Sequence, residues 1–128
     1  MSHFHAVVWL DHAEAHVLHF TRDDVENKLV HGKPHRQLHT KSNAQGSGHA
    51  AEDQGYFHKV AEALAGAHEI LVVGPANAKT EFVKHLSSHD PDLGKKVVAV
   101  ETVDHPSDGQ LLAYARKHFR ASDRMRGL

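Results

Sequence analysis

The sequence predicts an α/β fold in which helices cover a mixed five-stranded sheet, and three observations lead to this prediction. The first is Ile70–Val73, four consecutive apolar residues that end at Gly74-Pro75, as expected of a strand buried on both faces. The second is the helical spacing of apolar residues directly after that turn. The third is an alternating pattern near the amino terminus, which is typical of antiparallel strands.

The stretch before residue 32 is expected to hold three strands. Residues 4–10 alternate in a way that gives one strongly apolar face, and residues 15–20 follow a short turn and can pair with them antiparallel. Residues 25–31 predict a third and more polar strand, anchored by Leu29 and Val30. A short, charged strand of this kind suits the edge of a sheet.

A long loop over residues 32–54 is expected to separate these strands from the rest of the chain. Its apolar periodicity is lost, and a structureless connection of about twenty residues in a compact domain is usually either functional or disordered. The first half is basic and rich in histidine, which favours contact with phosphate groups, although a solvated surface loop has the same composition. The loop residues expected to make such contacts are Lys33, His35, Arg36, His39 and Lys41.

The second half of the chain predicts alternating helices and strands. Residues 57–64 place apolar side chains at helical spacing before the buried strand, and Val97–Val100 predicts a further strand after the helix that follows it. Ser107 and Gln110 are spaced as a capping box at the start of a last helix. The basic tail at residues 120–128 is expected to fray.

These elements predict how the sheet is assembled, with right-handed crossovers between its parallel strands. The strand at residues 70–73 should lie beside the first strand and parallel to it, and the second strand should be antiparallel to the first. The side chains expected to be buried are Val8, Leu10, Val17, Leu71, Val73, Phe82, Val98 and Leu112.

Length and composition favour a single domain over residues 1–128, long enough to bury about two-thirds of the surface that the unfolded chain exposes. The absence of cysteine excludes disulfides and thiolate metal sites. Neither a signal peptide nor an apolar run of about 20 residues is visible. We therefore expect a cytoplasmic protein with no membrane span and no cofactor.

Histidine is the unusual feature of the composition, because the chain has 15 of them and a formal net charge of −1. Since histidine titrates near pH ~6.5, acidification would make the protein cationic. The pairs His3/His5 and His35/His39 could ligate zinc, nickel or copper, but no cysteine or carboxylate completes a tight site. Histidines that replace other polar surface residues would give the same composition.

The turn after the buried strand is a candidate for anion binding. Gly74-Pro75 leads into the amino terminus of a helix, and Lys79 lies in its first turns. The turn lacks the glycines and the Lys-Ser/Thr pair of a Walker loop. A solvated Lys79 is therefore the simpler interpretation.

The expected sheet is of the ribonuclease-H-like kind, and nucleases with this fold hold two metal ions between clustered carboxylates. Here Asp11 follows the first strand, and Glu101 and Asp104 follow the last one. With the central strand between them, their backbones would be about 9–10 Å apart, and that strand ends without an acidic residue. We therefore do not expect a nuclease, and no nucleophile motif indicates a hydrolase.

Two stretches of the chain resemble a known family. ILVVGPANAKTEFVKHL, followed by KKVVAVETVDHPSDGQLL, is similar to the central domain of archaeal and eukaryotic class-one peptide-chain release factors and of Pelota. The shared features are a strand, a Gly/Ser-Pro turn, a lysine soon afterwards, a phenylalanine in the helix and a valine-rich strand. The chain looks closest to small single-domain bacterial translational machinery proteins, and is more distantly similar to host-attachment proteins.

The resemblance implies the fold and a link to ribosomes, but it argues against hydrolysis of peptidyl-tRNA. In the release factors the long loop before the first helix carries a Gly-Gly-Gln motif that enters the peptidyl-transferase centre. Here the loop at residues 32–54 holds Gly46-Ser47-Gly48 instead. Pelota also lacks the motif and does not hydrolyse peptidyl-tRNA.

The sequence therefore favours a non-enzymatic, translation-related protein that associates with ribosomes or ribosomal RNA. The loop at residues 32–54 would be the main contact, with Lys79 and Arg120 as auxiliary contacts. The alternative, from another class, is a histidine-rich stress protein that binds metal ions or anions. A cryptic hydrolase is a third hypothesis.

Overall fold

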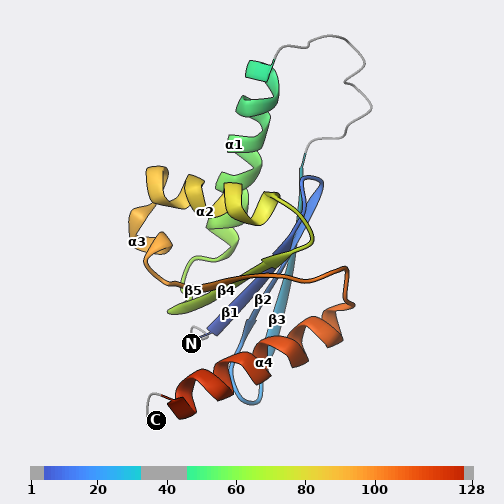
Figure 1. The fold of residues 1–128 in the computed structure, drawn as a ribbon, viewed down its shortest axis with the longest axis vertical. Helices are drawn as coiled ribbons and strands as arrows, with labels where there is room; N and C mark the ends of the chain where they lie inside the picture. The colour runs from blue at the N-terminus through green and yellow to red at the C-terminus, as the bar shows by residue number, and fades with distance from the viewer. Residues whose placement is uncertain (1–4, 33–45, 126–128) are drawn as a thin grey trace.

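The computed structural model describes the backbone of residues 5–32 and 46–125, and its elements follow the predicted order with one short helix added (Figure 1). The elements are β1 (His5–Leu10), β2 (Glu14–Phe20), β3 (Val25–His31), α1 (Gly46–Ala63), β4 (Glu69–Gly74), α2 (Ala78–His89), α3 (Pro91–Gly94), β5 (Val97–Thr102) and α4 (Asp108–Met125).

The five strands form one mixed sheet in the order β3-β2-β1-β4-β5. β1 pairs antiparallel with β2, where Val8 lies opposite Val17, and parallel with β4, where Val8 lies opposite Val72. β4 and β5 are also parallel. The predicted pairing of the first, second and fourth strands is confirmed, and so is the position of β3 at an edge.

Helices cover both faces of the sheet: α1 and α2 lie on one face and α4 on the other (Figure 1). Ala6, Val8 and Leu10 of β1 pack in the core under α1 and α2, whereas Val7 and Trp9 pack in the core under α4. β1 is therefore apolar on both faces, and the prediction of a single apolar face was wrong. A strand at the centre of a sheet with helices on both sides has no solvated face.

Two predicted segment boundaries need correction. α1 begins at Gly46, so residues 46–54 of the expected long loop belong to a helix. α4 continues to Met125, so residues 120–125 of the expected frayed tail are also helical. In both places the prediction followed the apolar periodicity, and a helix can extend beyond the residues that form its apolar stripe.

Most of the expected core is buried, including Phe82 and Leu71, which are both 0% exposed. Leu112 is half-buried against the core under α4. Val98 was predicted to be buried and is 45% exposed, and Leu29, the expected anchor of β3, is 53% exposed. Both residues lie on the edge strands, and Val98 lies beside an irregularity in the pairing of β4 with β5.

Local signals for turns and caps are confirmed by the structure. The Ser107 backbone N–H donates to Gln110 Oε1 at 2.9 Å, and the Gln110 N–H donates to Ser107 Oγ at 3.2 Å, which is the predicted capping box. At Gly74 an added Cβ would lie 2.4 Å from the carbonyl oxygen of Leu10, so only glycine fits there. None of the helices in the described part of the chain is long and apolar enough to cross a membrane.

Candidate nucleic-acid interface

The structure places two of the seven predicted phosphate contacts, Lys79 and Arg120. The other five lie outside the described residues and remain predictions: Lys33, His35, Arg36, His39 and Lys41. Lys79 lies in the first turn of α2 on one face of the sheet, whereas Arg120 lies in the second half of α4 on the other face (Figure 1). The fold therefore does not bring the two cations together.

The side chain of Lys79 forms a hydrogen bond with the turn that precedes α2. Its Nζ donates to the carbonyl oxygen of Ala76 at 2.5 Å, and the side chain is half-buried. A carboxylate, Glu81, already occupies the first turn of α2 and pairs with His12 at 3.0 Å. The positive end of this helix is thus already balanced by acidic charge, which disfavours a further anion.

Arg120, in contrast, belongs to a cluster of three arginines around a groove of about 320 Å³. We call this the arginine groove, and its lining residues are His5, Phe20, Thr21, Arg22, Arg116, Phe119 and Arg120. None of these lining residues, in the part of the chain that the structure describes, is acidic. Arg22 comes from the β2–β3 turn, whereas Arg116 and Arg120 are one helical turn apart on α4.

Arg116 is fixed in position by two contacts. Its Nη2 donates to the carbonyl oxygen of Thr21 at 2.9 Å, and its guanidinium lies 5.8 Å from the centre of the Phe20 ring. Both contacts tie α4 to the end of β2 and leave several guanidinium N–H groups for a ligand. Arg22 and Arg120 are exposed, so they can move toward a bound phosphate.

The floor of the arginine groove is formed by apolar rings that are almost completely buried. The His5 ring stacks on Phe20 at 5.8 Å and lies 4.2 Å from Phe119, measured between ring centroids. Phe20 and Phe119 are only 2% and 3% exposed. Because these rings are covered, nucleic-acid bases cannot stack on them, and the groove offers phosphate contacts rather than base recognition.

Sequence reasoning missed Arg22 and Arg116. Arg116 could have been found, because it precedes Arg120 by four residues and so lies on the same face of the helix. Arg22 could not have been found, since it is 94 residues from Arg116 in the chain and reaches the groove only through the pairing of β2 with β1 and the packing of α4.

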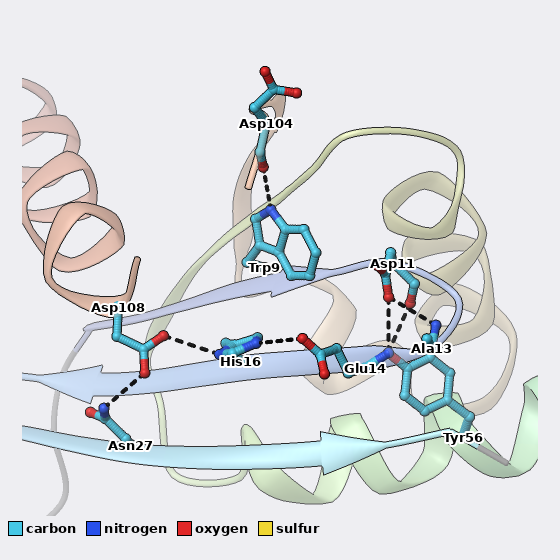
Figure 2. A network of polar contacts seen from close by, with 9 residues as sticks. All are labelled: Trp9, Asp11, Ala13, Glu14, His16, Asn27, Tyr56, Asp104 and Asp108. Carbon is cyan, nitrogen blue, oxygen red and sulfur yellow. Dashed lines mark hydrogen bonds and ion pairs between the residues drawn. The ribbon is translucent and has the colours of Figure 1, made fainter. Parts of the chain in front are cut away.

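At the other end of α4 a polar network holds the start of the helix on the sheet, and Figure 2 shows His16 between two carboxylates. The His16 imidazole lies 2.9 Å from Glu14 Oε2 and 3.0 Å from Asp108 Oδ1, and Asn27 Nδ2 donates to Asp108 Oδ2 at 3.3 Å. Trp9 Nε1 donates to the carbonyl oxygen of Asp104 at 2.6 Å. The network is therefore a structural clamp.

Two of the carboxylates that the sequence analysis considered for a two-metal site form separate hydrogen bonds within the protein. Asp11 Oδ1 accepts from the N–H groups of Ala13 and Glu14 at 2.8 and 2.9 Å, which closes the β1–β2 turn (Figure 2). Glu101 accepts a hydrogen bond from the Tyr114 hydroxyl. Among the described residues no group of three or more histidine, aspartate or glutamate side chains is arranged to hold a metal ion.

Most histidines with a resolved polar contact pair with a carboxylate. Examples are His5 with Glu69 at 3.4 Å and His58 with Glu62 at 3.3 Å. His85 is different, because it is 7% exposed and its Nδ1 lies 2.5 Å from Gln54 Oε1. Burial, followed by the neighbouring His89, lowers the pKa of His85 below its ordinary value.

Comparisons with known proteins find the fold but no sequence family. No family model matches the chain, and no curated protein matches it in sequence. Among solved structures, Archaeoglobus fulgidus Pelota is similar over 88% of this chain, with a TM-score of 0.61 at 16% identity. Thermoplasma acidophilum Pelota has a TM-score of 0.61 at 17% identity over 88% of this chain. An archaeal translation termination factor, aRF1, has a TM-score of 0.57 at 17% identity over 81% of it.

The similar region is only part of each of those proteins. The matches cover 30%, 32% and 31% of the two Pelota chains and of the termination factor, respectively. The chain thus spans about a third of the length of these neighbours. At this level of identity the likeness establishes a shared α/β fold with a mixed five-stranded sheet.

Proposed function

We propose that this chain is a cytoplasmic protein with a translation-related role that binds ribosomes or RNA and does not hydrolyse peptidyl-tRNA. The fold that it shares with Pelota and an archaeal termination factor supports the translation link. The resemblance of its sequence to the central domain of such factors, and to single-domain bacterial translational machinery proteins, supports the same role. The observation that carries the binding proposal is the arginine groove.

Three guanidinium groups around one groove are suited to binding a phosphate group. The planar fork of arginine matches two phosphate oxygens, and the groove has no carboxylate among its described lining residues to compete for it. Because the chain has a formal net charge of −1, binding must depend on local clusters of positive charge such as this groove rather than on the charge of the whole molecule. Binding should therefore be sensitive to salt and tolerant of sequence.

The test measures the affinity of the full chain for ribosomes and for a structured ribosomal RNA fragment over a range of salt concentrations. The variant is Arg22→Gln/Arg120→Gln, which leaves the anchored Arg116 in place. The slope of log affinity against log salt is negative, and each lost phosphate contact should reduce its magnitude by about 0.7–0.9. The double variant should therefore lose about 1.5 units of slope and bind more weakly at every salt concentration.

The matched control is Lys59→Gln/Lys84→Gln, which removes two exposed positive charges from α1 and α2 on the other face of the sheet. It should bind like the wild type. Equal losses in the two variants would mean that only net charge matters and would contradict the proposed site. A third variant, Lys33→Gln/Arg36→Gln/Lys41→Gln, measures the contribution of the predicted loop separately.

The same preparation is expected to release no peptide from peptidyl-tRNA on ribosomes, because the chain lacks a Gly-Gly-Gln motif. Release above background that disappears on Gln45→Ala or Ser47→Ala would contradict the non-enzymatic role. That result would support the cryptic hydrolase and leave the arginine groove untouched.

A further inference from the structure

The edge strand β5 offers an unused pairing surface. β5 is the last strand of the sheet and pairs on one side only, with β4. Its outer edge therefore presents backbone N–H and C=O groups to solvent, which is a template for another strand. Proteins usually blunt such an edge with charged side chains, proline or a covering helix.

β5 uses few of these protections. Its sequence is Val97–Thr102, VVAVET, with one charged residue, Glu101, near its end. Val98 and Val100 are 45% and 41% exposed, and Tyr114 of α4, whose hydroxyl donates to Glu101, is 38% exposed. These are three of the five exposed large apolar side chains among the described residues.

The opposite edge is built differently. β3 carries Glu26 and Lys28 within its length, so a strand approaching it would meet charged side chains. Of the two edge strands in the described sheet, β5 is the one that combines an open edge with a nearly uncharged sequence. β3 also has two exposed large apolar side chains, Val25 and Leu29, but its charged residues make it the less suitable edge for strand pairing.

The charged residues that flank β5 favour a second copy of this chain as the partner of the strand. Lys96 directly precedes the strand and Asp104 lies two residues after it. Within the described residues, neither the Lys96 ammonium nor the Asp104 carboxylate has an ion-pair partner. If two β5 strands pair antiparallel with Val100 on the two-fold axis, Lys96 of each copy lies opposite Asp104 of the other. The edge is therefore complementary in charge to itself.

We propose that the chain forms a symmetric homodimer through antiparallel pairing of two β5 strands, which joins the two five-stranded sheets into one. The interface is isologous, so each contact occurs twice. Val98 of one copy lies opposite Thr102 of the other, and the exposed valines are covered by the pairing. None of the residues that line the arginine groove is on β5, so the dimer and the RNA proposal are independent.

The experiment measures molar mass by sedimentation equilibrium over a range of protein concentrations, for the full chain and for Lys96→Glu and Asp104→Lys. Each single variant creates two like-charge contacts in the dimer and should raise the dimer dissociation constant about tenfold. An equimolar mixture of the two variants should form a heterodimer as tight as the wild-type dimer, because both charge pairs are then restored. A folding defect in either variant could not be rescued by mixing.

A second pair of variants compares the two edges of the sheet. Val100→Lys should abolish the dimer, whereas Leu29→Lys, an exposed position on β3, should leave its dissociation constant unchanged. A wild-type chain that stays monomeric up to about 1 mM would overturn the proposal and leave the β5 edge to a different protein. A dimer that is insensitive to Val100→Lys, or single variants that mixing does not rescue, would also overturn it.

Discussion

Two helices, α1 and α2, cover one face of the sheet, whereas α4 alone covers the other (Figure 1). Under α1 and α2 the packing is almost entirely apolar, with Phe57 and Phe82 in ring contact at 5.7 Å between centroids. Under α4 the apolar core is smaller, and polar contacts hold the helix at its start and near its middle. One of these is the Asp108–His16 pair and the other is the hydrogen bond from Arg116 to Thr21.

The difference between the two faces bears on the position of the arginine groove, which lies beside α4. The apolar cluster under α1 and α2 is the larger of the two, so this face contributes more to stability. On the other face α4 is held by polar contacts as well, and one of them, from Arg116 near the middle of the helix, brings arginines together at the end of β2. The predictions below test this contrast, from the largest expected effect to the smallest.

The largest effect should come from the core under α1 and α2. Phe82→Ala removes a fully buried ring and should lower the free energy of unfolding by about 3–5 kcal/mol. Leu112→Ala on α4 removes a half-buried side chain and should cost only about 1 kcal/mol. Urea denaturation of both variants provides the measurement. Equal losses would contradict the difference in burial between these two positions.

The second effect is a dependence of stability on pH that arises under α1 and α2. The pKa of His85 is lowered by burial, so the folded chain resists protonation while the unfolded chain takes up a proton near pH ~6.5. The contribution of His85 is fully present above pH ~6.5 and is lost as the pH falls through that value toward the folded-state pKa.

His85→Asn should therefore lose less stability than the wild type between pH 7.5 and 5.5, as measured by thermal unfolding at each pH. Lys84→Asn, at the neighbouring exposed position on α2, controls for the substitution itself and should follow the wild type. A His85→Asn variant with the wild-type dependence on pH would assign the effect to other histidines.

The smallest effect lies between α4 and β5. A hydrogen bond to Glu101, followed by burial, raises the pKa of the Tyr114 phenol to about 12. Glu101→Gln removes the carboxylate and should bring this pKa back toward ~10. Titration of the absorbance at 295 nm in a Tyr56→Phe background isolates this group. A Tyr114 that already titrates near pH ~10 in the parent would contradict the contact.

Some of the candidate site could be predicted and some could not. Arg120 was predicted as a phosphate contact because it lies in a basic segment, and Arg116 was recoverable from its helical spacing. Arg22 was not recoverable, because no local pattern links the β2–β3 turn to the end of α4. Val98 was predicted to be buried because runs of valine are typical of central strands. The apolar pattern does not show whether a strand has neighbours on both sides, and so it could not show that this strand lies at an edge.

The sequence by itself determined the order of the elements, the buried strand at residues 70–73, the parallel neighbours β1 and β4, and the capping box at Ser107. These features depend on short-range periodicity and on the stereochemistry of turns, which neighbouring residues specify. Only the tertiary structure decided that three arginines meet in one groove and that one edge of the sheet stays open. Both depend on contacts between residues distant in the chain, which local patterns do not encode.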